Sequence, residues 1–131
     1  MGLVRVLLAA DSSELCQELA DFLTREGFAF LGTAGDVDSL VEADELLDPD
    51  VIVVDISMTG FTGTAAAQRL KRAGSRAKVV FLAESLDERL ISMGEAVGGQ
   101  AFVAKSRLHL DLAVAIRVAL EGGKFVSQVG V

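Results

Sequence analysis

The stretch Val51-Ile52-Val53-Val54-Asp55 decides the fold, because four β-branched residues run directly into a carboxylate. A continuous run of Val and Ile, without alternation of polar and apolar residues, is typical of a strand buried on both faces of a parallel sheet. Ligands of such sheets bind at the carboxyl ends of the strands. Asp55 falls at that end of its strand, and we therefore take it as the centre of a candidate functional site.

The rest of the chain alternates short apolar segments with segments of helical periodicity. We expect strands at residues 3–9, 28–33, 51–54, 78–82 and 101–104, and helices between residues 12 and 27, 35 and 49, 65 and 73, 85 and 98, and 108 and 121. This pattern predicts an α/β fold whose parallel sheet is covered by helices on both faces. Right-handed crossovers favour a flavodoxin-like (βα)5 doubly wound sheet with strand order 2-1-3-4-5.

Side chains at the helix starts and a glycine at one helix end support these boundaries. Asp11 or Ser12 can cap the first helix, and Gly27 suits the left-handed residue that ends it. Ser85 is the residue that we expect to cap the fourth helix. The segment between residues 56 and 63 holds two glycines and three hydroxyl residues, which predicts an irregular loop after Asp55.

Composition narrows the class of protein. The chain has 131 residues, which is typical of one domain, and 51% of them are hydrophobic. The net charge of −7 argues against non-specific binding of nucleic acid by the domain itself. No run approaches the roughly 20 apolar residues of a membrane span. The single cysteine, Cys16, cannot form an intrachain disulfide, which is consistent with a cytoplasmic protein.

Three charged side chains are expected to meet above the sheet. In the 2-1-3-4-5 order the first and third strands are neighbours, so Asp11 and Asp55 should lie side by side, with Lys105 reaching in from the fifth strand. Carboxylate oxygens are ligands that Mg²⁺ prefers. An aspartate can also act as a nucleophile toward a phosphoryl group, and a lysine ammonium can then pair with the phosphoryl oxygens. These residues predict a site for a cation and phosphate chemistry.

Four stretches of this sequence resemble the receiver domain of bacterial two-component response regulators. They are Val51–Met58 followed by Gly60 and Gly63, Lys78–Leu82, Gly98–Lys105, and Ala115–Ser127. The last stretch resembles the final helix and linker of regulators that carry a LuxR-type DNA-binding domain. The resemblance covers nearly the whole chain and implies a receiver domain over residues 1–123, followed by a C-terminal tail or linker at 124–131.

The resemblance also implies roles for individual residues. Asp55 would be the phospho-acceptor and Asp11 a direct ligand of Mg²⁺. Ser57 would supply a backbone carbonyl to the metal, and Lys105 would hold the phosphoryl group. Phe102 matches the aromatic switch position on the fifth strand. The domain would be a phospho-accepting signalling module and not an enzyme with a turnover substrate.

Five residues depart from the family pattern. Thr59 and Ser106, each in place of a proline, are mild departures, whereas the other three weaken the phosphate site. Ala10 stands where the first residue of the acidic pair is expected, so Mg²⁺ would lose a carboxylate. Ala83 replaces the hydroxyl residue that normally bonds the phosphoryl group, which removes a hydrogen bond of about 1.5–3 kcal/mol. Glu84 either adds negative charge beside the phosphoryl position or pairs with Lys105.

Three functions stay open at this point. The chain is either a receiver that takes phosphoryl on Asp55 from a histidine kinase, or a degenerate receiver that signals through protein contacts without phosphorylation. A flavodoxin-like nucleotide or flavin binder is the third alternative, but no glycine-rich phosphate loop follows the first strand. The motifs suit both a stand-alone receiver and the N-terminal part of a longer regulator, in which DNA would be bound only by a separate output domain.

The last helix suggests a partner surface. Leu110, Val114 and Val118 fall roughly opposite its core-facing stripe, beside Arg117 and Glu121. Exposed apolar residues on one helix face are typical of an interaction surface, and receivers use the faces of their last helix for dimers. We therefore expect a homodimer through this helix, with scattered surface residues as the alternative.

Overall fold

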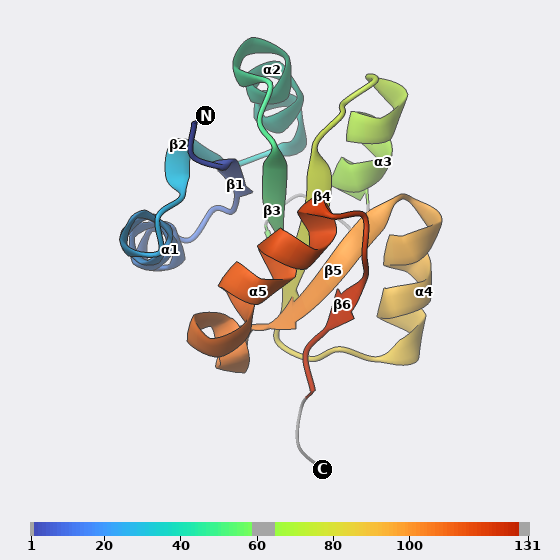
Figure 1. Ribbon diagram of the computed structural model, residues 1–131. Coiled ribbons are helices and arrows are strands. Elements are labelled where there is room, and N and C mark those ends of the chain that lie inside the picture. Colours follow the sequence, from blue (N-terminus) through green and yellow to red (C-terminus); the bar gives the residue numbers. More distant parts are fainter. Residues whose placement is uncertain (1, 59–64, 129–131) are drawn as a thin grey trace.

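The computed structural model describes residues 2–58 and 65–128 (Figure 1). Its strands are β1 (Arg5–Ala9), β2 (Ala29–Ala34), β3 (Val51–Asp55), β4 (Lys78–Ala83), β5 (Gly99–Ala104) and β6 (Phe125–Val126). Its helices are α1 (Ser13–Arg25), α2 (Val37–Leu47), α3 (Ala65–Arg72), α4 (Glu88–Ala96) and α5 (Leu108–Leu120), with a short 3-10 helix at Lys105–Arg107. Most of the loop predicted after Asp55, from Thr59 to Gly63, lies outside the described residues.

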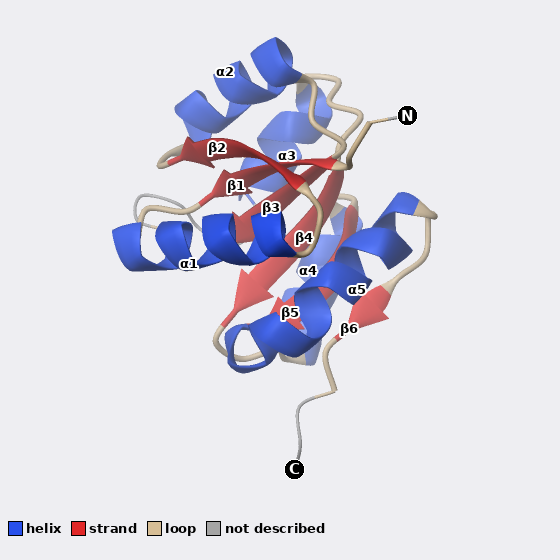
Figure 2. Ribbon diagram, turned by 60° about the vertical axis from the view of Figure 1, so that its left-hand side comes forward, coloured by secondary structure: helices blue, strands red, loops and turns tan. Residues whose placement is uncertain are grey.

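All strands of the sheet are parallel, and their order is β2-β1-β3-β4-β5-β6. The predicted order 2-1-3-4-5 is therefore confirmed, with β6 added at the edge beyond β5. Helices α1 and α5 cover one face of the sheet, and α2, α3 and α4 cover the other (Figures 1 and 2). This arrangement brings the carboxyl ends of β1, β3, β4 and β5 to one edge of the molecule.

The apolar run of β3 is buried on both faces, as its sequence predicts. Val51 and Val53 pack into the core under α1 and α5, whereas Ile52 and Val54 pack into the core under α2, α3 and α4. Alternate residues of a strand point to opposite faces, so a strand between two helical layers needs apolar side chains at every position. Burial of each of these side chains contributes about 1.5–3 kcal/mol.

Side-chain caps begin two of the helices that border the candidate site. The Ser12 hydroxyl accepts a hydrogen bond from the Leu15 N–H at 3.3 Å, so Ser12, one of the two expected residues, caps α1. The expected cap of α4 is wrong: Asp87 and not Ser85 occupies the N-cap, and its carboxylate accepts from the Leu90 N–H at 2.8 Å. Ser85 lies two residues too early in the chain, and a charged carboxylate is a strong acceptor at a helix N-terminus.

A sixth strand, β6, lies where the sequence pattern predicts only a tail. Phe125 pairs with Ala101 of β5, and Val126 pairs with Phe102. The Ser127 N–H extends this pairing by donating to the Phe102 carbonyl at 2.9 Å. A strand of two residues is too short to show periodicity, so no sequence signal distinguishes it from a linker.

Glycine is required where α4 meets β5, and this predicts a clear effect on stability. A Cβ on Gly99 would lie 2.6 Å from the ring of Phe81 and 2.9 Å from the Gly94 carbonyl oxygen. Because the ring is fully buried and the carbonyl is backbone, neither can move cheaply. We expect Gly99→Ala to lower the free energy of unfolding in urea by about 1–3 kcal/mol.

Gly35 is the matched control for this substitution, because a Cβ there would meet nothing within 4 Å. Gly35→Ala should change the free energy of unfolding by no more than about 0.5 kcal/mol. Equal effects of the two substitutions would contradict the close packing described at Gly99.

Among the described residues, no helix combines the length and apolarity needed to cross a membrane.

Candidate functional site

The sheet topology brings the three predicted charged residues to one pocket. Asp11 follows β1, Asp55 ends β3 and Lys105 follows β5. Together with Glu84, which follows β4, they line a pocket of about 460 Å³. The other lining residues are Ser12, Glu14, Leu15, Glu18 and Ser57. Since β1 and β4 flank β3 directly, the three strands place their terminal residues within reach of one another.

Asp55 is buried, and one of its carboxylate oxygens is saturated with donors. The residue is 2% exposed. Its Oδ1 accepts from the Ser57 N–H at 3.1 Å and from the Ser57 hydroxyl at 2.8 Å, and it pairs with Lys105 Nζ at 2.9 Å. A buried carboxylate needs such partners, because an uncompensated charge away from water is costly. The arrangement leaves Oδ2 without a hydrogen-bond donor in the described part of the chain.

The Ser57 hydroxyl is a site group that the sequence analysis did not identify. It donates to Asp55 and also accepts from Lys105 Nζ at 2.9 Å, so it bridges the two charged residues. The resemblance implies only a backbone carbonyl role for this residue. A hydroxyl two residues after a strand-end aspartate is the available signal, because a side chain there can bond back to the carboxylate.

Glu84 faces the same ammonium group but interacts with it weakly. Its Oε1 lies 3.7 Å from Lys105 Nζ, and its side chain is 81% exposed. Exposed ion pairs of this kind contribute little, because water screens them. Asp55 is therefore the main ion-pair partner of Lys105, and Glu84 is a second, more distant partner.

Asp11 and Asp55 act on a common neighbour, the Cys16 thiol. Burial raises the pKa of Cys16, and the negative charges of Asp11 and Asp55 raise it further. The thiol therefore lies in the electrostatic field of both carboxylates. A lone thiol with a raised pKa is poorly reactive, which agrees with a packing role for Cys16.

Two of the residues that depart from the family pattern, Ala10 and Ala83, are buried alanines. Ala10 packs with the core under α1 and α5, and Ala83 ends β4 opposite Ala104. Neither side chain can bind a cation or donate a hydrogen bond. In the described part of the chain, no three Asp, Glu, His or Cys side chains gather to hold a metal ion.

Phe102, the predicted switch residue, lies inside the fold. Its ring stacks on Phe81, with the ring centres 5.5 Å apart and the planes at 24°. A Cβ on Gly94 of α4 would lie 2.4 Å from the same ring, so helix and ring are in tight contact. Phe102 thus packs α4 against β5, the strand that leads to Lys105.

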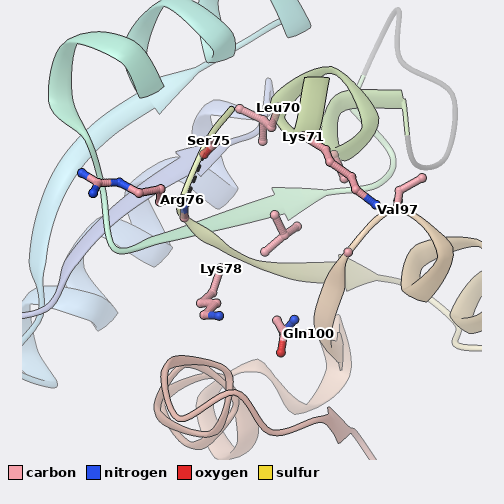
Figure 3. Close-up of a pocket in the computed structure, with 11 residues that line it drawn as sticks. Leu70, Lys71, Ser75, Arg76, Lys78, Val97 and Gln100 are labelled. Atoms are coloured by element: carbon pink, nitrogen blue, oxygen red, sulfur yellow. Dashed lines mark hydrogen bonds between the residues drawn. The ribbon is translucent and has the colours of Figure 1, made fainter. Parts of the chain in front are cut away.

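A second hollow lies at the opposite end of the sheet, and its lining does not suit phosphoryl transfer. Its volume is about 240 Å³, and Lys71, Lys78 and Gln100 are among its lining residues (Figure 3). Arg76 extends away from the others and pairs with Asp48 at 3.1 Å. The Ser75 hydroxyl donates to Asp44 at 2.9 Å. None of the described residues that line this hollow carries a carboxylate, so none of them is a candidate aspartyl phospho-acceptor.

Comparison with known proteins relates the chain to one family. The response regulator receiver domain family matches residues 6–117. The transcriptional regulatory protein PdtaR of Mycobacterium tuberculosis (strain ATCC 25618 / H37Rv) is 33% identical over 117 residues, covering 88% of this chain and 56% of PdtaR. The transcriptional regulatory protein LiaR of Bacillus subtilis (strain 168) is 30% identical over 121 residues, covering 92% of this chain and 57% of LiaR.

The fold is also shared with solved receiver structures. The non-phosphorylated receiver domain of the stress response regulator RcsB from Escherichia coli superposes with a TM-score of 0.85 at 21% identity. That match covers 97% of this chain and 100% of the RcsB domain. By contrast, the chain spans just over half the length of PdtaR and LiaR.

Proposed function

Because the chain belongs to the response regulator receiver domain family, we propose that it accepts a phosphoryl group on Asp55 from a histidine kinase. One observation carries this proposal: Asp55 lies in the pocket at the carboxyl edge of the sheet, with Lys105 Nζ 2.9 Å from its carboxylate. The aspartate carboxylate can attack phosphorus, and the neighbouring ammonium group can pair with the oxygens of the phosphoryl group that it receives. Receiver domains are generally signalling domains, and a nucleotide- or flavin-binding role has no support from the family match.

The proposed transfer is a displacement at phosphorus. Oδ2 of Asp55 attacks the phosphorus of a phosphohistidine, a new O–P bond forms, and the N–P bond breaks with its electron pair returning to the imidazole. Oδ1 cannot easily attack, because Ser57 and Lys105 occupy it. As charge builds on the phosphoryl oxygens, the Lys105 ammonium is close enough to pair with them.

Mg²⁺ would have a reduced set of ligands at this site. The carboxylates of Asp11 and Asp55 and the backbone carbonyl of Ser57 would hold it, and all three are the oxygen donors that this ion prefers. When bound, the ion neutralises negative charge on the carboxylates and the phosphoryl group. Ala10 supplies no further ligand, so we propose that more positions around the ion are filled by water and that Mg²⁺ binds weakly.

Binding of beryllofluoride, a mimic of the phosphoryl group, tests the proposed function. We expect wild-type protein with Mg²⁺ to give a bound beryllofluoride signal by fluorine NMR, and we expect no such signal without Mg²⁺. Absence of binding at millimolar beryllofluoride and saturating Mg²⁺ would contradict phosphoryl acceptance. It would support the alternative that the domain is a degenerate receiver acting through protein contacts, which Ala10 and Ala83 favour.

Restoring the missing hydroxyl should strengthen phosphoryl-analogue binding. Ala83→Thr places a donor at the end of β4, and a hydrogen bond to a charged acceptor contributes about 1.5–3 kcal/mol. We expect the dissociation constant for beryllofluoride to fall by at least about tenfold, measured by the same NMR titration. Adding Ala10→Asp should lower the Mg²⁺ concentration required.

Ala29→Thr on β2 is the control for this gain, because it adds the same side chain to a strand outside the pocket. If Ala29→Thr lowered the dissociation constant for beryllofluoride as much as Ala83→Thr does, the gain would not be an effect of the hydroxyl at the site.

The output of the domain is proposed from its relatives and its surface. PdtaR and LiaR are named transcriptional regulatory proteins, and each is longer than this chain. We propose that residues 1–123 act as the receiver and that residues 124–131 lead toward a separate output domain, through which alone DNA would be bound.

A homodimer through α5 is part of this proposal. Leu110 is 67% and Val114 is 49% exposed, and they lie one helical turn apart. Val118 is expected to be exposed on the same face, but it is half-buried because its side chain lies against Gly123. We expect light scattering at high protein concentration to show dimers of the wild type and monomers of the Leu110→Glu/Val114→Glu variant. Wild-type protein that stays monomeric would contradict the dimer.

A further inference from the structure

The C-terminal segment, residues 124–127, is docked against the strand that leads to Lys105. β6 lies beside β5 in the space between α4 and α5 (Figure 1). Lys124 pairs with Glu95 of α4 at 3.5 Å at the start of the segment. Ser127 is the buried end of it, with 4% of its surface exposed.

The Ser127 hydroxyl acts both as a donor and as an acceptor in this contact. It donates to Asp111 Oδ2 of α5 at 2.7 Å and accepts from the Ala104 N–H at 3.1 Å. Asp111 is in turn held by Arg107, whose Nε donates to Oδ2 at 2.8 Å. The Arg107 guanidinium lowers the pKa of Asp111, so the carboxylate stays charged and remains a strong acceptor.

This chain of bonds ends one residue before Lys105. β5 would be the edge of the sheet without β6, and its Ala104 N–H faces the edge. The Ala104 N–H would need a backbone carbonyl of a neighbouring strand as its acceptor, but β6 ends at Val126. The Ser127 hydroxyl accepts this hydrogen bond instead. Ser127 therefore holds the peptide group between Val103 and Ala104, one residue before the lysine that extends toward Asp55. Arg107 lies on the other side of Lys105, so both flanks of the lysine are tied to Asp111.

We propose that Ser127 and Asp111 are positioning residues for Lys105, and that docking of the C-terminal segment is thereby linked to phosphoryl-group binding at Asp55. The second half of this statement rests on the proposed function. Linkage is reciprocal: if docking favours the bound state of the pocket, occupancy of the pocket favours docking by the same factor. This linkage would pass the state of Asp55 to the C-terminal segment.

Reactivity of the Lys105 amine tests the positioning role in protein that has never been phosphorylated. Lys105 should react slowly with acetic anhydride, because its ammonium is paired with Asp55 and bonded to Ser57. We expect Ser127→Ala to raise the labelling rate of Lys105, read by peptide mass spectrometry, at least about threefold relative to Lys78. In Ser127→Thr, Lys105 should be labelled at the wild-type rate, because threonine keeps the hydroxyl. An unchanged Lys105 rate in folded Ser127→Ala protein would overturn the positioning role.

Two further variants complete this test. Ser106→Ala removes an exposed hydroxyl next to Lys105 that bonds to nothing in the described chain, so it should leave the labelling rate unchanged. Asp111→Ala removes the carboxylate that accepts from Ser127, and this residue lies on a different element. It should raise the labelling rate of Lys105 in the same way, so it replaces Ser127→Ala if that variant does not fold. A raised rate in Ser106→Ala, or a wild-type rate in Asp111→Ala, would overturn the proposal.

Beryllofluoride affinity tests the linkage separately. We expect Ser127→Ala to raise the dissociation constant about fivefold or more, with Ser127→Thr close to wild type. An equal affinity of Ser127→Ala and wild type would disprove the linkage while leaving the proposed function intact. If wild type itself fails to bind beryllofluoride, the proposed function and the linkage fail together, whereas the labelling experiment still decides whether Ser127 positions Lys105.

Discussion

Asp55→Asn is expected to abolish phosphoryl transfer to this chain, reducing it to background with both acetyl phosphate and a phosphorylated kinase as donors. The amide is nearly the same size as the carboxylate, and its oxygen can still accept from the two Ser57 donors. What it loses is the negative charge of the nucleophile, since an amide attacks phosphorus poorly. The change therefore removes the reactive group with little change in shape.

Asp38→Asn provides the matched control for the loss of activity. Asp38 is exposed on α2, and within residues 2–58 and 65–128 its carboxylate pairs only with Arg69, at 3.0 Å. Its neutralisation should therefore have little effect on folding or on the pocket. Asp38→Asn should be phosphorylated at the wild-type rate. Residual transfer to Asp55→Asn above background would show that another residue accepts the phosphoryl group.

Lys105→Met should cause the second large effect, a loss of stability. The substitution keeps most of the apolar stem but leaves the Asp55 carboxylate buried without its counter-charge. Breaking a buried ion pair by removing one partner costs about 3–5 kcal/mol, and we expect about 2–3 kcal/mol because Lys105 is partly exposed. Urea unfolding at neutral pH measures this difference.

The double variant Asp55→Asn/Lys105→Met separates loss of the pair from general damage. Without a charge at position 55, the missing ammonium should matter little, so the double variant should regain most of the lost stability. A double variant as unstable as the sum of the two single variants would mean that Asp55 and Lys105 do not depend on each other in the folded protein.

The sequence predicts the strands and their order well, because the buried strands are continuous apolar runs. Val51–Val54 reads as a doubly buried strand, and its alternate residues do fill two cores. The strand order follows from connection rules that hold for most parallel sheets. That order in turn explains why residues as far apart as Asp11, Asp55 and Lys105 line one pocket.

The features that the sequence does not predict depend on single side chains or on a strand of only two residues. The cap of α4 is Asp87, because the helix begins three residues later than Ser85. The Ser57 hydroxyl and the β6 strand both act through individual hydrogen bonds, and these leave no periodic trace in a sequence. The same holds for the Ser127–Asp111 contact, whose partners are 16 residues apart and belong to different elements.

Phosphorylation of the wild-type protein measures directly whether Asp55 is a phospho-acceptor despite Ala10 and Ala83. The protein is incubated with acetyl phosphate and Mg²⁺, and its intact mass and its peptides are then measured under conditions that preserve acyl phosphates. We expect one added phosphoryl group on the peptide that contains Asp55, and none on Asp55→Asn. Wild-type protein that stays unmodified, or that carries the phosphoryl group on another residue, would contradict this role of Asp55.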